Sequence, residues 1–411
     1  MIHYKRFWVF ATLVLLTSAL SAQNTNSVYS RYGLGLFDNP SMGKTNAMGG
    51  IGYGYHDHGL LNVLNPASYA DVDTMNMLFE FDMSAQLTAF KIGSSSQINP
   101  NSYLNNVAMK VALKPNWGLA FGLYSLSKVG YEFHQEVSLS DPILGDLNYI
   151  KAFKGSGGLN TVFLGTGFVP LKNLSLGINL NYTFGMLSNS NSTNYVSSSI
   201  NNESNFQYLY LGLPGVDVGF QYDLALSNKK KLTLGASYSA WKTTSSEFKT
   251  STISTDTVEH SSMYDFNLGN TLGLGLSYQY DKRITVGLDY QQRFLSRALF
   301  LGSSDSLKDQ TRVALGVEYL PSSNTNNYLQ AVRYRMGLQY TDMYFKEPGQ
   351  LKTASITMGV GLPLRGQKSM LNLGFEMGKL FTPNATFIDE SYYKLSVGIS
   401  FNELWFFKLK L

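Results

Sequence analysis

Alternation of apolar and polar residues is the feature that most constrains this 411-residue chain. Residues 174–184 read LSLGINLNYTF, with apolar side chains at every second position and small or polar ones between them. Successive side chains of a β-strand point to opposite faces, so such a stretch predicts a strand with one apolar face. The same pattern begins again at Leu232, Ile284, Val313, Tyr334, Leu371 and Leu395. The sequence therefore predicts an all-β protein.

Strand length and composition favour a membrane barrel over a soluble sandwich, although alternation alone is compatible with both. Several runs reach about 10 residues, which is longer than the average strand and suits a tilted membrane crossing. Hydrophobic residues make up 44% of the chain and charged residues only 15%, yet the mean hydropathy is −0.09. This combination is typical of transmembrane β-barrels and excludes a disordered chain. The net charge of +4 argues against a nucleic-acid partner, and the absence of cysteine excludes disulfides and thiolate metal sites.

Connection lengths alternate between short and long, as in bacterial outer-membrane barrels. The short connections are expected at 114–116, 170–173, 227–230, 281–282, 321–324 and 363–366. The long connections are expected at 91–102, 130–157, 188–206, 245–262, 300–308, 345–351 and 381–390. We predict a transmembrane antiparallel β-barrel of about 14 strands over residues 74–411, with both ends on the periplasmic side.

The N-terminus has the layout of a cleaved signal peptide. Lys5 and Arg6 precede an apolar run that ends at Leu16, and small residues continue to Ala22. This order is that of a secretory signal, and the apolar run is too short to span a bilayer easily as an anchor. We predict a signal peptide over residues 1–22 and export to the outer membrane of a Gram-negative cell.

Residues 23–73 lack sustained alternation and are rich in Gly, Asn, Met and Tyr. A barrel of about 14 strands has a lumen wide enough to leak unless something fills it. We therefore expect this segment to fold into the lumen as a hatch, or plug. Glycines on the inward face would leave room for it, or would merely mark bends and bulges. These glycines are Gly177, Gly235, Gly287, Gly316, Gly337 and Gly374.

Residues capable of catalysis or metal binding are few. The triplet at residues 56–58, His-Asp-His, lacks a third spaced ligand, so we interpret it as part of a loop. No histidine falls on a predicted strand, so we expect no catalytic residues, no metal and no cofactor, and hence no enzyme. Arg31 could bind a ligand carboxylate or pair with an acidic residue of the wall. The candidate acids are Asp217, Asp289, Glu318 and Glu376.

Five short motifs stand out in the chain. They are SRYGLG at 30–35, MGG at 48–50, the Asn65-Pro66-Ala67 triplet, GGLN at 157–160 and NLSLG at 173–177. In their order along the chain they resemble the FadL/TodX family of outer-membrane transporters for long-chain fatty acids and other hydrophobic compounds, in particular its divergent members in Bacteroidota. The resemblance implies a 14-stranded barrel with an N-terminal hatch. It also implies passive diffusion of an apolar ligand, which leaves sideways through a kinked third strand, around residues 117–133.

The ligand pocket is then expected beside the hatch, where aromatic residues and methionines suit a loosely specific apolar site. Its candidate residues are Tyr29, Arg31, Tyr32, Phe37, Met42 and Met48. The expected partners are outer-membrane lipid and a hydrophobic small molecule. An alternative is a FadL-like barrel that serves protein secretion or envelope assembly without transport, similar to the shuttle protein of type IX secretion. A loop-presenting adhesin is a third possibility.

Overall fold

The structure is a computed structural model, and it describes residues 27–141, 145–196, 201–303, 305, 307–322, 327–346, 349–364, 369–383 and 387–404. The predicted signal peptide, residues 1–22, lies outside these ranges. Within them, no helix is both long and apolar enough to cross a membrane.

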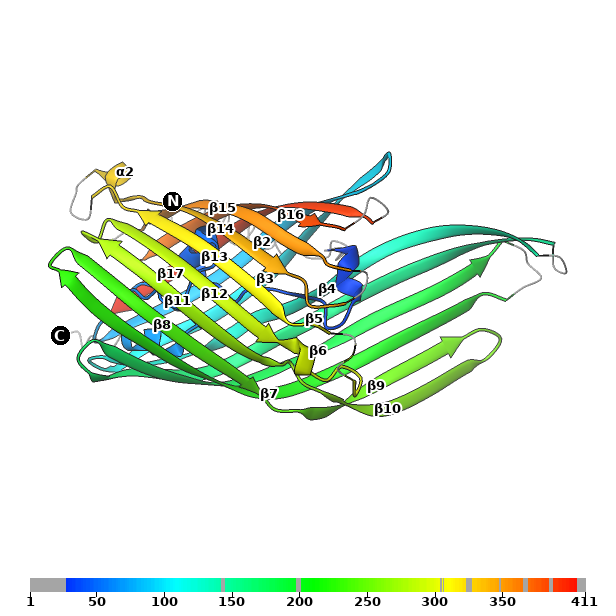
Figure 1. Cartoon of the computed structure of the whole chain (residues 1–411), viewed down its shortest axis with the longest axis horizontal. Coiled ribbons are helices and arrows are strands. Elements are labelled where there is room, and N and C mark those ends of the chain that lie inside the picture. The colour runs from blue at the N-terminus through cyan, green and yellow to red at the C-terminus, as the bar shows by residue number, and fades with distance from the viewer. Residues whose placement is uncertain are drawn as a thin grey trace, which may run out of the picture.

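A closed antiparallel barrel of 14 strands forms the body of the molecule (Figure 1). Its first half comprises β2 (Asn76–Ile92), β3 (Ser95–Lys114), β4 (Trp117–Asp141), β5 (Gly145–Leu171), β6 (Leu174–Tyr195), β7 (Glu203–Ser227) and β8 (Lys230–Trp241). Its second half comprises β11 (Asn270–Tyr280), β12 (Ile284–Phe294), β13 (Gln310–Tyr319), β14 (Arg333–Asp342), β15 (Lys352–Pro363), β16 (Met370–Phe381) and β17 (Asp389–Leu404). β8 pairs with β11, and β17 pairs with β2 to close the barrel. The predicted fold class and strand number are confirmed.

The apolar face of each strand lies on the outside of the barrel. On β6, Leu180 is 57% exposed, whereas its neighbour Asn181 is 5% exposed and faces the lumen. A soluble sandwich would bury the leucine and expose the asparagine. The observed arrangement is that of a barrel whose solvent is lipid.

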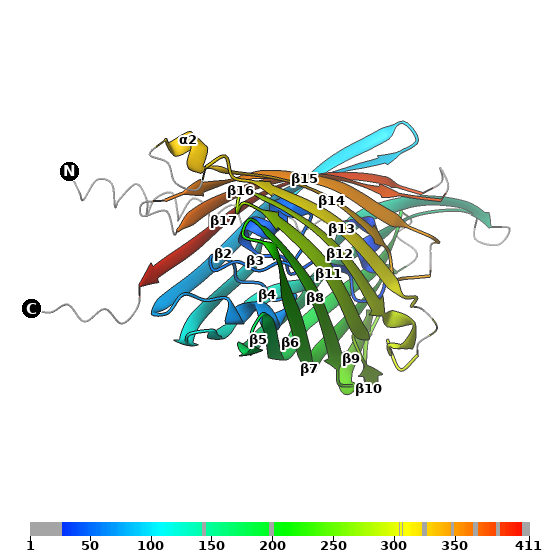
Figure 2. The same cartoon turned by 60° about the vertical axis from the view of Figure 1, so that its left-hand side comes forward.

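Several predicted long connections are wrong, because the strands continue through them as extended hairpins. β4 continues to Asp141 and β5 begins at Gly145. Most of the predicted connection at 130–157 is therefore paired strand. The connections predicted at 91–102 and 188–206 are likewise mostly strand, and 245–262 forms a hairpin of β9 (Thr244–Ile253) and β10 (Thr257–Phe266). Beyond the bilayer a strand needs no apolar face, so alternation fades while backbone pairing persists. The hairpins project from one end of the barrel (Figures 1 and 2).

The N-terminal segment, residues 27–75, packs against the inward face of the wall. It contains the short helices η2 (Val28–Arg31), η3 (Gly43–Met48) and η4 (Pro66–Ala70) and the two-residue strand β1 (Leu36–Phe37). η3 contacts β13 to β17, and η4 contacts β4 to β7. From inside the barrel, the segment therefore contacts two opposite parts of the wall, and the blue ribbon lies within the barrel (Figure 2). Two further short helices, η5 (Leu295–Arg297) and α2 (Tyr328–Ala331), lie in connections between strands.

Inward-facing glycines let this segment approach the wall closely. A Cβ atom on Gly235 would lie 1.8 Å from the carbonyl oxygen of Tyr53, and one on Gly177 would lie 2.2 Å from the carbonyl carbon of Pro66. A similar clash would occur at Gly287, Gly316 and Gly337, against Ile51, Met48 and Gly49. Gly374 differs, because its nearest atoms would be 3.7 Å away. Most of these glycines are therefore required by the fit of the N-terminal segment.

Candidate functional site

The Asn65-Pro66-Ala67 motif anchors the N-terminal segment to the wall. The Asn65 side chain accepts a hydrogen bond from the N–H of Ala67 (3.2 Å) and so caps η4. Its amide nitrogen donates to the carbonyls of Tyr53 (2.7 Å), Phe220 (3.0 Å) and Ala236 (3.3 Å). Asn65 thus joins two parts of the segment to β7 and β8. The motif positions the segment and does not line the cavity described below.

The wall is interrupted between β3 and β4. Their pairing runs from Lys114 and Trp117 only as far as Asn106 and Tyr124. Beyond that point β3 pairs with β2, and β4 pairs with β5 after a register shift between Ser125 and Ser127. The hairpin of β2 and β3 leans away from β4 (Figure 2). This wall separation begins beyond Tyr124 of β4, which is the third strand of the barrel.

The N-terminal segment occupies the wall separation from the inside. Leu36 and Phe37 of β1 pair with Lys128 and Ser127 of β4, where β3 would otherwise lie. The N–H of Asp38 donates to the carbonyl of Leu126 (2.9 Å), and the Asp38 carboxylate binds the Lys128 amine (2.5 Å). Residues 34–38 therefore replace a missing strand neighbour.

Gly35 makes this contact possible. Its φ is +84°, and a Cβ there would lie 2.5 Å from the carbonyl oxygen of Lys128. Glycine is the residue that tolerates both the positive φ and the close approach.

A cavity of about 200 Å³ lies beside the wall separation. Tyr103 and Asn105 of β3 line it, as do Ser125 and Lys128 of β4, so the cavity reaches the place where the two strands part. Its other walls are residues 36–41 of the N-terminal segment and the inward faces of β12 to β17. We call this space the lumenal cavity.

The lining of the lumenal cavity is mixed, and it includes seven charged and seven amide side chains. The four cations are Lys128, Arg293, Arg312 and Lys394, and the three carboxylates are Asp38, Glu376 and Glu390. Lys394 binds Glu376 at 2.6 Å, in addition to the Lys128–Asp38 pair. Burial acts to raise the pKa of Asp38, but the Lys128 charge outweighs it, so the pKa is lowered.

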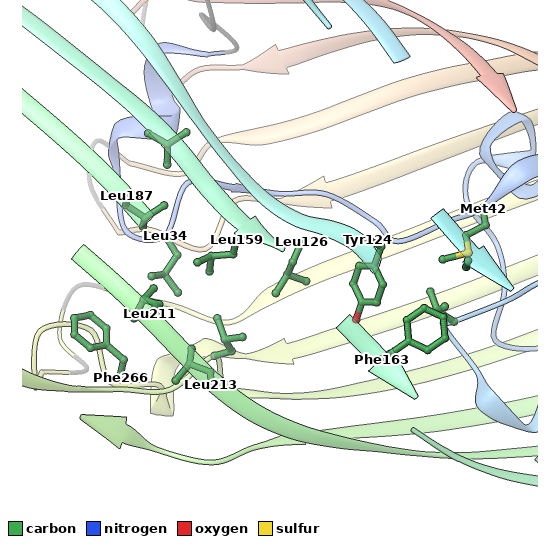
Figure 3. Close-up of a cluster of buried hydrophobic side chains, with 14 of the residues drawn as sticks. Leu34, Met42, Tyr124, Leu126, Leu159, Phe163, Leu187, Leu211, Leu213 and Phe266 are labelled. Carbon is green, nitrogen blue, oxygen red and sulfur yellow. The ribbon is translucent and has the colours of Figure 1, made fainter. Parts of the chain in front are cut away.

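Apolar packing fills the opposite side of the lumen. Leu34 and Met42 of the N-terminal segment lie in a cluster of side chains from β4 to β7 and from the end of β10 (Figure 3). The other labelled members are Tyr124, Leu126, Leu159, Phe163, Leu187, Leu211, Leu213 and Phe266. The segment is therefore held by apolar contacts on one side and borders a polar cavity on the other.

Of the six residues predicted to bind ligand, Phe37 alone lines the lumenal cavity. Met42 and Met48 are fully buried in packing contacts. Tyr29 is also buried, and its hydroxyl donates to the carbonyl of Ile388 (2.8 Å). The Tyr32 ring lies 5.2 Å from the Phe345 ring.

The predicted pairing of Arg31 with a wall acid is wrong. Arg31 is exposed, and its guanidinium lies 5.2 Å from the ring centre of Phe153 and 5.6 Å from that of Phe133. The four candidate acids have other partners. Asp217 accepts from the Asn181 amide, and Asp289 accepts from the N–H groups of Gly52 and Tyr53. Glu318 forms ion pairs with Arg333 and Arg335, and Glu376 forms one with Lys394. An exposed cation is stabilised more easily over aromatic rings than by insertion into the lumen.

Sequence reasoning missed the basic residues of the cavity. Arg293 of β12 and Arg312 of β13 occupy inward-facing positions, between residues that face outward. A basic residue at an inward-facing position of a barrel strand is the signal that could have identified them.

His56 links the N-terminal segment to β7. Its Nδ1 lies 2.7 Å from Asp71 and its Nε2 lies 3.0 Å from Asp223. Burial acts to lower the pKa of His56, but the bonds to Asp223 and Asp71 prevail and raise it to about 9. His58 also contacts Asp71, at 2.9 Å. In the described part of the chain, no cluster of three or more His, Asp or Glu side chains is arranged to hold a metal.

The fold and its apolar outer belt define an outer-membrane β-barrel with the FadL-like architecture. The toluene transporter TodX of Pseudomonas putida matches with a TM-score of 0.56 at 15% identity, covering 93% of this chain and 100% of TodX. The toluene transporter TbuX of Ralstonia pickettii gives 0.60 at 14%, covering 90% and 100%. A FadL homologue of Pseudomonas aeruginosa gives 0.60 at 11%, covering 90% and 99%. At these identities the likeness establishes the fold.

A family model described as BamG matches residues 1–411. The chain therefore belongs to the BamG family. No curated protein is significantly similar to it in sequence.

Proposed function

We propose that this protein lets hydrophobic small molecules, such as long-chain fatty acids, cross the outer membrane by passive diffusion, with residues 23–73 acting as the hatch. The observation that carries the proposal is the wall separation between β3 and β4, which adjoins the lumenal cavity and is occupied by residues 34–38. An apolar solute that passes through the wall into the bilayer avoids water altogether. TodX and TbuX, which share this fold, are toluene transporters, and this supports the proposal.

Passage requires only a local displacement of the hatch. Residues 34–38 contact β4 through a small set of hydrogen bonds, each with a net value of about 0.5–1.5 kcal/mol. The rest of the hatch is held by Asn65, His56 and the glycine-lined wall. The proposed route requires residues 34–38 to move, which also breaks the Asp38–Lys128 ion pair, the bonds of Leu34 and Gly35 to the Tyr344 hydroxyl and the apolar contacts of Leu34.

A reversible crosslink tests this proposal. The chain has no cysteine, so Leu36→Cys with Lys128→Cys introduces a single facing pair. Facing residues of antiparallel strands have Cα atoms about 4.5–5.5 Å apart, within the range of a disulfide. We expect oxidation to stop fatty-acid uptake into proteoliposomes and reduction to restore it. The control pair, Val286→Cys with Val317→Cys, joins β12 to β13 within the wall and should leave uptake unchanged. Equal uptake by the oxidised and reduced Leu36/Lys128 variant would contradict the proposal.

Partnership with another envelope protein is a second candidate function. The extended hairpins beyond the membrane expose large apolar side chains, among them Val196, Val258 and Met263. Exposed apolar surface outside the lipid belt is typical of protein contacts. Val258→Lys with Met263→Lys should then remove an envelope protein that co-purifies in mild detergent. The same set of co-purified proteins in both forms would exclude β10 as the contact.

A further inference from the structure

We propose that Glu80 and Asp82 of β2, together with Asn106 of β3 and Ser400 of β17, bind a Ca²⁺ ion between the hatch and the wall. We call these four residues the carboxylate site. The inference goes beyond the proposed function and does not depend on it. It also departs from the expectation, drawn from the sequence, that the chain binds no metal.

Two buried carboxylates lie on the same face of β2. Glu80 and Asp82 are two residues apart on the strand, so both side chains point into the barrel. Glu80 is 0% exposed and Asp82 is 1% exposed. Among the described residues, neither carboxylate pairs with a Lys, Arg or His side chain. Like charges in one buried site repel each other, and a buried charge without a counter-ion is costly.

Both carboxylates lie against Gly43, at the start of η3. The N–H of Gly43 donates to Oδ2 of Asp82 (2.9 Å). A Cβ on Gly43 would lie 3.1 Å and 3.3 Å from the two carboxylate oxygens of Glu80. Oε1 of Glu80 also accepts from the N–H of Leu61 (3.4 Å) and from the hydroxyl of Ser400 (3.1 Å), which faces it on β17. The carboxylate site therefore joins the hatch to the wall.

Two oxygens of the carboxylate site accept no hydrogen bond from the described part of the chain. They are Oε2 of Glu80 and Oδ1 of Asn106. Asn106 is 2% exposed, faces Asp82 across the strand pair and hydrogen-bonds to its carboxylate, so its side chain points into the site. Buried polar atoms normally have a partner. Two acceptors without donors, beside two carboxylates, therefore indicate a bound cation.

Lys110 of β3 does not fill this role. Its charge acts on Glu80, but its amine donates to the carbonyls of Leu60 (2.7 Å) and Asp71 (2.9 Å). Those bonds hold the amine against the N-terminal segment. Within the ranges that the structure describes, both carboxylates are thus left without a direct ion pair.

The chemistry of the site favours Ca²⁺. Its ligand atoms are all oxygens, from two carboxylates, an amide carbonyl and a hydroxyl. Ca²⁺ takes such ligands in a flexible geometry, whereas Mg²⁺ retains several waters and requires a near-ideal octahedron. A site this deeply buried favours the ion that retains fewer waters. A single shared proton would cancel one negative charge, whereas Ca²⁺ cancels both.

Calorimetry and metal analysis of the full-length protein test the inference. The protein is purified in an uncharged detergent, treated with a chelator, desalted and titrated with CaCl2 or MgCl2 at pH 8 in excess NaCl. We expect one Ca²⁺ per chain, bound about tenfold or more tightly than Mg²⁺. Because both carboxylates lie against Gly43, Ca²⁺ should also slow hydrogen exchange in residues 42–48.

Matched variants locate the ion. Asp82→Asn keeps the shape of the side chain, removes one negative charge and should abolish Ca²⁺ binding. Glu80→Gln makes the equivalent change at the other carboxylate, so the test survives if one variant fails to fold. Asp217→Asn is the control, because Asp217 is another buried, inward-facing carboxylate, on β7, whose partners include Asn181. It should bind Ca²⁺ like the natural protein.

Three results would overturn the inference. The first is no Ca²⁺ binding at pH 8, which would show that protons neutralise the two carboxylates. The second is Ca²⁺ binding that persists in Asp82→Asn and Glu80→Gln, which would place the ion elsewhere. The third is equal affinity for Ca²⁺ and Mg²⁺. None of these results alters what the Leu36/Lys128 crosslink shows about uptake, so the carboxylate site and the proposed transport are judged separately.

Discussion

Replacement of Asn65 by alanine should release the hatch locally without unfolding the barrel. The change removes the N-cap of η4, which costs about 1 kcal/mol. The carbonyl of Tyr53 also loses its 2.7 Å donor but keeps the Gln221 side-chain amide at 3.1 Å, so this loss costs about 1 kcal/mol. Phe220 and Ala236 lose weaker contacts. The sum of about 2 kcal/mol corresponds to a roughly 30-fold larger population of the locally opened segment.

Hydrogen exchange read by mass spectrometry measures this population directly, because exchange of protected amides follows local opening. The variant and the natural protein are compared in the same detergent, over peptides that cover residues 52–70 and over wall peptides from β12 and β13. Asn270→Ala is the control, since it removes a single exposed hydrogen bond, to the Tyr238 hydroxyl. It should leave exchange in residues 52–70 unchanged.

The expected result is faster exchange confined to residues 52–70. Unchanged exchange there would show that Asn65 does not hold the hatch. Equally faster exchange in β12 and β13 would show that the hatch and wall unfold as one unit, which would refute local release.

Two further predictions concern the fit of the hatch. Gly235→Ala should expose the hatch to added protease, because its Cβ would overlap the Tyr53 carbonyl, whereas Gly374→Ala should not. His56 is stabilised in its protonated form, with a pKa of about 9 against an ordinary 6.5. Its contribution is complete below about pH 6.5 and is lost as the pH rises through about 9. The protection factors of hatch amides, which are taken relative to the intrinsic exchange rate at each pH, should therefore fall across that range. They should lose this fall in His56→Gln but keep it in His58→Gln.

The sequence predicted the wall well, because lipid demands strict alternation wherever a strand crosses the membrane. The runs beginning at Leu174 and Ile284 consequently identify both the strands and their outward faces. Outside the lipid that demand ends, so the hairpin of β9 and β10 carries no comparable pattern. The Asn65-Pro66-Ala67 triplet stood out in the sequence only as a short motif, and the bonds of Asn65 to β7 and β8 were not predicted.

The candidate site was harder to predict, because it depends on residues far apart in the chain. Arg31 lies over Phe133 and Phe153, which alternation alone does not place near the N-terminus. Likewise, Gln291 and Arg312 become neighbours only through the register of β12 and β13. Side-chain pairing across strands follows from register, and a single sequence does not fix register around an entire barrel.

The contacts of η3 and η4 have a mechanical consequence. η3 contacts β13 to β17 and η4 contacts β4 to β7, so the chain between them connects two parts of the wall across the lumen. A barrel is normally closed by hydrogen bonds between every pair of neighbouring strands. Here the hydrogen bonds between β3 and β4 end at Asn106 and Tyr124. In the proposed route, this internal connection would keep the two sides of the barrel in place when residues 34–38 move away from β4.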